Sequence, residues 1–140
     1  MIRKANINDA ERVHTLLEQI YLFHHNLSPE DFPGVGSKYA LEEVQAMLED
    51  ESKTIIVYDD GVVEGYLIGW FNGSCFFIDD LCVDENSRGK SIGKKLISYV
   101  EDVLKFEHIQ LNVWLRNSSA IAFYEKLGFA PLKYVMRKKK

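Results

Sequence analysis

The stretch Arg88-Gly89-Lys90-Ser91-Ile92-Gly93-Lys94 lies where a predicted strand gives way to a predicted helix. A helix that starts just after a strand presents unpaired N–H groups and the positive end of its dipole to the preceding turn. Gly89 and Gly93 carry no Cβ, so an anion can approach the backbone closely. Three basic side chains add positive charge. The stretch therefore predicts a phosphate or pyrophosphate site.

Two other phosphate-binding motifs fit this turn less well. Gly89-Lys90-Ser91 resembles the end of a P-loop, but that motif needs a glycine where the chain has Asp84. The dinucleotide fingerprint belongs to a parallel unit, whereas the preceding segments are predicted to form hairpins. An ordinary loop with basic surface residues is the remaining alternative, and the turn alone does not decide between it and an anion site.

The rest of the pattern predicts a mixed α/β fold with a mostly antiparallel central sheet and flanking helices. Asn8 is expected to cap the first helix with Glu11 as its box partner, and Asn72-Gly73 is a hairpin signal. The expected strands are 2–5, 54–58, 62–71, 75–83, 109–115 and 130–136. The first expected helix begins after Asn8 and ends near His24. Three further helices are expected at 38–49, 91–105 and 118–127.

Length and composition indicate one domain, residues 1–140. The formal net charge of -4 does not favour nucleic-acid binding. Cys75 and Cys82 would lie roughly 23 Å apart in one extended strand, too far for a disulfide. They are interpreted as reduced thiols of an intracellular protein. Neither a signal peptide nor a membrane-spanning run is found, so we expect a cytoplasmic protein with no membrane partner.

The chain resembles the GNAT superfamily of acetyltransferases over nearly its whole length. The first signature of that family falls on Asn86, Gly89 and Ser91, although Asn86 and Ser91 depart from its usual residues. The second signature runs from Asn117 to Phe129, with Tyr124 and a Leu-Gly-Phe ending in the family positions. The resemblance implies a GNAT-like fold and an acetyl-CoA-dependent N-acetyltransferase. Such an enzyme moves the acetyl group to a primary amine of a small molecule or peptide by direct attack.

The resemblance also implies catalytic roles. Tyr124 resembles the general acid of the family, although without the resemblance it would be interpreted as an aromatic residue packed on its helix. Asp79 and Asp80 are candidates for the base, acting through water. Adjacent strand residues point to opposite faces unless a bulge intervenes, so one of the two should face the site. Family members often carry Glu at the position of Asp79, which we therefore prefer. A pair of surface acids is the alternative.

The family binds the pantetheine arm through strand backbone and the pyrophosphate through the glycine-rich turn. Asn117 is expected to bond the pantetheine, to cap its helix, or both. Cys82 is interpreted as a small core residue rather than a nucleophile, because no histidine is near it in sequence and the family transfers directly. The predicted cofactor-binding residues are Leu81, Cys82, Val83, Arg88, Gly89, Lys90, Ser91, Ile92, Gly93, Lys94 and Asn117.

The region between the first two helices often forms the acceptor lid in this family. Tyr21, His25, Asp31, Phe32 and Asp80 are therefore candidates for substrate contact. His24 and His25 lack partners at metal-binding spacing, so no metal is expected. Family members are often dimers, so the resemblance also allows a homodimer.

Two other functions stay open. A catalytically weak acyl-CoA-binding regulatory module of the same fold is favoured by the departures at Asn86 and Ser91, and disfavoured by Tyr124. A nucleotide-binding protein is disfavoured by Asp84.

Overall fold

The computed structural model describes all 140 residues and contains one five-stranded sheet in the order β1-β2-β3-β4-β5. Strands β1 to β4 pair antiparallel, and β5 runs parallel to β4. The mixed, mostly antiparallel α/β fold is thereby confirmed. The strands are β1 (Ile2–Lys4), β2 (Thr54–Asp59), β3 (Val63–Asn72), β4 (Cys75–Val83) and β5 (His108–Leu111). The helices are α1 (Ala10–Leu27), α2 (Leu41–Glu49), α3 (Ile92–Val103) and α4 (Ser118–Lys126).

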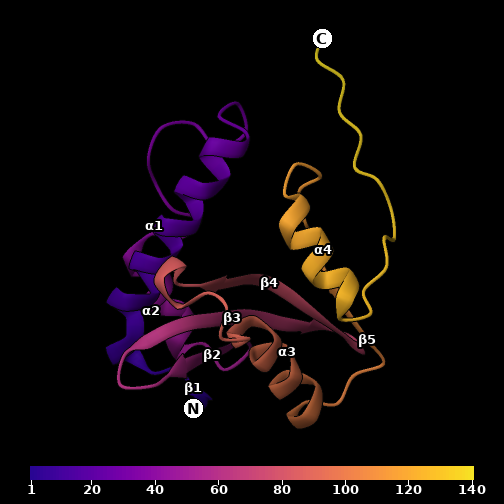
Figure 1. Ribbon diagram of the computed structural model, residues 1–140. Coiled ribbons are helices and arrows are strands. Elements are labelled where there is room, and N and C mark those ends of the chain that lie inside the picture. Colours follow the sequence, from indigo (N-terminus) through magenta and orange to yellow (C-terminus); the bar gives the residue numbers. More distant parts are fainter.

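The two faces of the sheet bury separate apolar clusters. Tyr66 and Ile68 of β3 pack with α1 and α2, whereas Leu67 between them packs with α3. This alternation follows from the two-residue period of a strand and buries β3 on both faces. Side chains of α4 pack against the α3 cluster. In the view of Figure 1, α1 and α4 both extend above the sheet, although they pack against its opposite faces.

Strands β4 and β5 pair over part of their length only. Their register runs from Cys75↔His108 to Ile78↔Leu111, after which β4 continues to Val83 paired with β3 alone. The register with β3 also shifts, because Ile68 pairs with Asp80 and Gly69 with Ile78. Asp79 is the extra residue of this β-bulge. From Asp79 onward, the edge of β4 that faces β5 is therefore open.

The start of the first helix differs from the prediction. A short 3₁₀ turn, Ile7–Asp9, precedes α1, and its cap is Asn6 rather than Asn8. The Asn6 side chain accepts from the Asn8 N–H at 3.0 Å, and the Asp9 carboxylate accepts from the Asn6 N–H at 2.9 Å. Asp9 thus takes the place predicted for Glu11, and the predicted cap was wrong by two residues.

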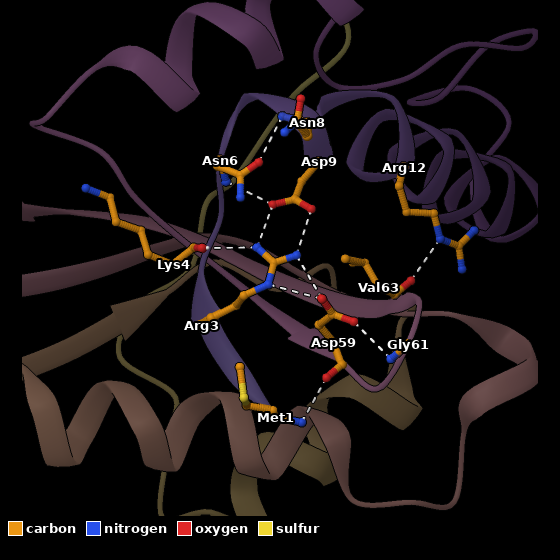
Figure 2. Close-up of polar contacts among 10 residues, drawn as sticks. All are labelled: Met1, Arg3, Lys4, Asn6, Asn8, Asp9, Arg12, Asp59, Gly61 and Val63. Carbon is orange, nitrogen blue, oxygen red and sulfur yellow. Dashed lines mark hydrogen bonds and ion pairs between the residues drawn. The ribbon is translucent and has the colours of Figure 1, made fainter.

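Arg3 is the physical reason for this shift. Its guanidinium donates to the Asp9 carboxylate at 2.8 and 2.9 Å and to Asp59 Oδ2 at 2.9 Å, as Figure 2 shows. Hydrogen bonds from Arg3 hold the pKa of Asp9 below its ordinary value. The contacts of Arg3 with Asp9 and Asp59 fix the start of α1 against β1 and the end of β2. The contact of Arg3 with Asp59 spans 56 residues, so it leaves no local sequence signal, whereas Asn6 and Asp9 stand at capping-box spacing.

The strand predicted at 130–136 does not form. After Phe129 the chain has no secondary structure, and Figure 1 shows it passing α4 and ending away from the sheet. Tyr134 and Val135 are 81% and 92% exposed. Strand-like residues form a strand only where a partner strand is present, and this segment pairs with none in the chain's own sheet. No helix combines the length and apolar character needed to cross a membrane.

Candidate active site

The glycine-rich turn connects β4 to α3. Gly89 has φ of +85° with open space where a Cβ would stand, and Ser91 adopts the left-handed region at φ +60°. Ser91 is the N-cap of α3 and makes no side-chain cap hydrogen bond. The N–H groups of the first turn of α3 therefore lack the usual side-chain acceptor. This geometry suits an oxyanion placed at the helix N-terminus.

Residues of α1 fix the start of this turn. Arg12 forms an ion pair with Asp84, and the Gln19 amide oxygen accepts from the Glu85 N–H at 2.9 Å. Asp84 also accepts from the Asn86 N–H at 3.0 Å. The Asn86 N–H, and after it Arg12, lower the pKa of Asp84. The sequence did not indicate Arg12 or Gln19, because their partners lie far along the chain.

The predicted cationic residues of the turn are exposed. The Lys90 ammonium is 3.3 Å from Glu64 Oε1, and the Arg88 guanidinium lies 5.8 Å from the ring centroid of Phe23. Lys94 lies on the exposed side of the first turn of α3. Gly93 allows the Phe123 ring of α4 to pack closely against α3, since a Cβ there would lie 3.0 Å from that ring. Ile92 is buried beneath the same turn.

The open edge of β4 leads directly into this turn. Cys82 is buried toward α1, and its Sγ is 3.6 Å from the Leu16 carbonyl oxygen. Burial raises the pKa of the Cys82 thiol to about 12, so the thiolate that a nucleophile needs is scarce at neutral pH. Leu81 and Val83 pack with the α3 cluster. Their main-chain groups on the β5 side are not used by a neighbouring strand.

Asp79 and Asp80 have different partners at the bulge. Lys38 Nζ donates to Asp79 Oδ1 at 3.0 Å, and Tyr39 Oη donates to Asp79 Oδ2 at 2.6 Å. Tyr66 Oη donates to Asp80 Oδ2 at 3.0 Å. Both carboxylates therefore meet residues that pack with α1 and α2, an arrangement that the bulge permits. Burial raises the pKa of Asp80 to about 6.

Helix α4 carries the predicted Asn117 and Tyr124. Asn117 is buried and caps the helix, since its Oδ1 accepts from the Ala120 N–H at 3.2 Å. The ring of Tyr124 packs edge-on against Phe123 and Phe129, with centroids 5.1 and 5.5 Å away. Burial, and after it the charge of Asp80, raise the pKa of Tyr124. The phenol is consequently protonated at neutral pH.

Comparison with known proteins agrees with this arrangement. The model of the acetyltransferase (GNAT) family matches residues 19–129. The chain belongs to the GNAT acetyltransferase family. The spermine/spermidine N(1)-acetyltransferase of Bacillus subtilis (strain 168) is 29% identical over 107 residues, which cover 64% of this chain and 70% of that protein.

Solved GNAT-like structures show the same fold. A mutant of the BH1408 protein from Bacillus halodurans matches with a TM-score of 0.90 and 26% identity, covering 100% of this chain and 99% of that one. The PaiA N-acetyltransferase from Thermoplasma acidophilum, solved in complex with coenzyme A, matches with a TM-score of 0.75 at 18% identity. That match covers 93% of this chain and 89% of the other.

In this GNAT chain an aromatic cluster lies at the end of α1. Phe32 stacks on His24 at 4.9 Å between centroids and meets Tyr21 and Trp114 edge-on at 5.6 and 5.1 Å. His25 Nδ1 lies 2.6 Å from the Phe32 carbonyl oxygen. Of the predicted acceptor-side residues, Tyr21, His25 and Phe32 are thus brought together. The sequence did not indicate Trp114, which lies beyond β5.

The α1–α2 loop also carries Asp31, Lys38 and Tyr39, which make the other polar contacts of the predicted acceptor side. The Asp31 carboxylate accepts from Ser28 Oγ at 2.7 Å and pairs with Arg137 at 2.7 Å, so it faces the tail rather than Asp80. Lys38 and Tyr39, which the sequence also did not indicate, bind the end of the α1–α2 loop to Asp79. These contacts therefore hold the α1–α2 loop against β4 at Asp79, next to Asp80.

Proposed function

We propose that this protein transfers the acetyl group of acetyl-CoA to a primary amine by direct attack. The observation that carries the proposal is the open edge of β4. It begins at the bulge with Asp80, follows Leu81 to Val83, and ends at the turn where α3 presents free N–H groups. An extended ligand with an anionic end fits such an edge, because strand backbone binds the arm and the helix N-terminus binds the phosphates.

The residues present suit acetyl-CoA. The main chain of Leu81 to Val83 would hold the pantetheine arm, and the turn from Gly89 to Gly93 would hold the pyrophosphate. Arg88 and Lys94 are exposed nearby and add positive charge. The thioester supplies an activated acetyl group. A main-chain N–H of β4 would polarise its carbonyl.

Asp80 is the better candidate for the base than Asp79. An alkylamine has a pKa near 10.4 in water, so its proton must be removed before attack. A carboxyl whose pKa lies close to neutral pH accepts a proton more readily than one with an ordinary pKa, and burial raises that of Asp80 to about 6. The Asp79 carboxylate is already engaged by Lys38 and Tyr39. We therefore assign Asp79 to positioning of the α1–α2 loop.

Tyr124 is the proposed proton donor to the departing sulfur. Its phenol keeps its proton at neutral pH, because burial and the charge of Asp80 both oppose ionisation. The charge of Asp80 acts on the Tyr124 phenol, which supports assigning the proposed base and acid to one site. Asn117 caps α4 and so sets the position of Tyr124 along the helix axis.

A cationic amine suits the acceptor side. Aromatic faces attract cations, and Asp80 supplies a negative charge at the bulge. The Bacillus subtilis relative is a spermine/spermidine acetyltransferase. Polyamines are therefore the first acceptors to test, followed by aminoglycosides, amino acids and peptide N-termini.

The test is thiol release from acetyl-CoA across this amine panel. We expect at least one amine to accelerate release, and Tyr124→Phe to slow it without abolishing acetyl-CoA binding. Tyr99→Phe, on α3, is the matched control and should behave as the wild type. If acetyl-CoA binds but no amine accelerates release, the regulatory acyl-CoA-binding module replaces the enzyme. If acetyl-CoA does not bind even at millimolar concentration, the proposal is overturned.

A further inference from the structure

We propose that Lys38 is a site of self-acetylation, whose side-chain amine takes the acetyl group from acetyl-CoA bound to the same chain. This inference rests on the proposed function, which supplies the acetyl donor. Lys38 Nζ donates to the main-chain oxygen of Asp79 and to Asp79 Oδ1, each at 3.0 Å. Asp79 is the bulge residue at which the open edge of β4 begins. A primary amine of the chain therefore lies at the start of the proposed acetyl-CoA site.

The Lys38 amine also lies near the proposed base. Burial raises the pKa of Asp80, and the charge of Lys38 is the strongest effect that lowers it. Burial, and after it the charge of Lys38, also lower the pKa of His24 at the end of α1. The amine thus acts on groups of both the bulge and the acceptor side. This is the region in which the proposed function places an acceptor amine.

No other lysine has this position. Lys90 Nζ is 3.3 Å from Glu64 Oε1, and Lys53 Nζ lies 4.0 Å from the ring centroid of Trp70. Both of these partners belong to β3. Of the lysine side chains, only Lys38 donates a hydrogen bond to β4. A reaction at the bulge should therefore distinguish Lys38 from the other lysines of the chain.

The Lys38 side chain is free to leave its present partner. It is 47% exposed, whereas the side chain of Asp79 is 9% exposed. Water screens an ion pair with such an exposed cation, so the pair is weak. Tyr39 Oη still donates to Asp79 Oδ2 at 2.6 Å after Lys38 has moved, so the carboxylate keeps a partner. The amine can then turn toward the thioester on its flexible stem while the loop stays in place.

The groups already assigned to the site complete the reaction. The ionised Asp80 carboxylate takes a proton from the Lys38 ammonium, and the neutral amine attacks the thioester carbonyl carbon. The C–N bond forms and the C–S bond breaks. Tyr124 gives its proton to the departing sulfur and regains one from the nitrogen that becomes the amide. The products are N-acetylated Lys38 and the free thiol of CoA, and the proton on Asp80 passes to water.

The test is incubation of the full chain with isotope-labelled acetyl-CoA and no added amine, followed by peptide mass spectrometry. Lys38 should gain label at least about 10-fold faster than Lys53, because it is held beside the donor. Asp80→Asn and Tyr124→Phe should each slow the labelling of Lys38 by about 100-fold and leave that of Lys53 unchanged. The rate constant should not depend on protein concentration, since donor and acceptor belong to one chain.

Lys38→Arg is the matched variant, because arginine keeps the positive charge but its guanidinium does not give up a proton. Thiol release without an added amine should then lose the phase in which each wild-type chain releases one thiol. The most active amine of the panel should slow the labelling of Lys38 in the wild type, because both amines need the same position. Labelling that this amine leaves unchanged at saturation would overturn the proposal.

Other outcomes separate this inference from the proposed function. Equal labelling of Lys38 and Lys53, unaffected by Asp80→Asn, would be spontaneous acetylation and would overturn the inference. A rate constant that rises with protein concentration would show attack at a second copy, which also overturns it. If an added amine is acetylated while Lys38 stays unlabelled, the proposed function is supported and the inference is wrong. If acetyl-CoA does not bind, both are wrong.

Discussion

The hydroxyl of Tyr66 donates a hydrogen bond to Asp80 Oδ2 over 3.0 Å, joining β3 to the bulge of β4. Tyr66 is fully buried, so its hydroxyl has a fixed position. Burial raises the pKa of Asp80 to about 6, whereas the charge of Lys38, and after it the hydrogen bond from Tyr66, lower that pKa. Burial and these two neighbours therefore set the pH at which the proposed base becomes available.

The first prediction concerns the pH dependence of acetyl transfer. The ionised form of Asp80 accepts the proton, so kcat/KM should rise as pH increases through about 6. Tyr66→Phe removes the bond that favours ionisation and should move this rise to higher pH. Asp80→Asn should lower kcat/KM by about 100-fold and flatten the rise. Asp79→Asn is the control and should keep it. A flat profile in Asp79→Asn, with the rise intact in Asp80→Asn, would make Asp79 the base.

The second prediction concerns stability. The pKa of Asp80 is about 6 in the folded protein and 3.8 ordinarily, so between these values the folded state binds more protons than the unfolded state. The contribution of Asp80 to the free energy of unfolding should therefore fall as pH rises from about 4 to about 6, by at most about 3 kcal/mol. Urea unfolding of wild type and Asp80→Asn across this range measures the difference. A difference between the two that does not change with pH would contradict the raised pKa.

The third prediction concerns the contact between Tyr39 and Asp79. Tyr39→Phe removes the 2.6 Å hydrogen bond, leaving Lys38 as the partner of Asp79. The loss should cost about 1.5 kcal/mol and loosen the α1–α2 loop. We expect the KM for the amine to rise severalfold while the KM for acetyl-CoA stays unchanged. An equal rise in both would mean that the contact supports the fold in general rather than the acceptor side.

The parts of the fold and site that the sequence predicted correctly depend on local signals. The hairpin predicted at Asn72-Gly73 joins β3 to β4, with Gly73 and Ser74 as its loop, and α3 begins within one residue of its predicted start at Ser91. The turn from Arg88 to Lys94 lies between β4 and α3 as expected. In each case the determining residues are neighbours in sequence, such as glycines with positive φ or apolar residues at helical spacing.

The parts that the sequence missed depend on distant partners. Asn6 and not Asn8 caps the first turn, because Arg3, which the distant Asp59 also holds, directs Asp9 back to the Asn6 N–H. Residues 130–136 have a strand pattern, but they pair with no strand of the sheet. Trp114 joins the acceptor side only because β5 carries it to Phe32. Patterns within a short window contain neither the contact of Arg3 with Asp59 nor that of Phe32 with Trp114.

The fourth prediction concerns Cys82. Its thiol is buried, and burial raises its pKa to about 12, so a thiol reagent should modify Cys75 alone in the native protein. Cys82→Ala should keep kcat close to the wild-type value, with a loss of stability of about 1 kcal/mol from the small cavity. Cys75→Ala is the matched control. Loss of activity in Cys82→Ala out of proportion to its stability would indicate a covalent role.

The fifth prediction concerns the left-handed cap of α3. Ser91 has φ +60° and ψ +27°, a conformation that costs a residue with a Cβ about 1–2 kcal/mol and glycine almost nothing. Its side chain makes no cap hydrogen bond that would be lost. Ser91→Gly should therefore raise the free energy of unfolding by about 0.5–1 kcal/mol, since the greater flexibility of glycine in the unfolded chain offsets part of the relief.

Ser98→Gly is the matched control for Ser91→Gly, because it makes the same chemical change in the interior of the same helix. There glycine has no left-handed conformation to relieve, so the free energy of unfolding should fall by about 0.5–1 kcal/mol. Urea unfolding with equal m-values measures both. If Ser91→Gly destabilises as much as Ser98→Gly does, Ser91 is not left-handed in solution. The N–H groups of the turn would then face differently, and the proposed pyrophosphate site would lose its geometry.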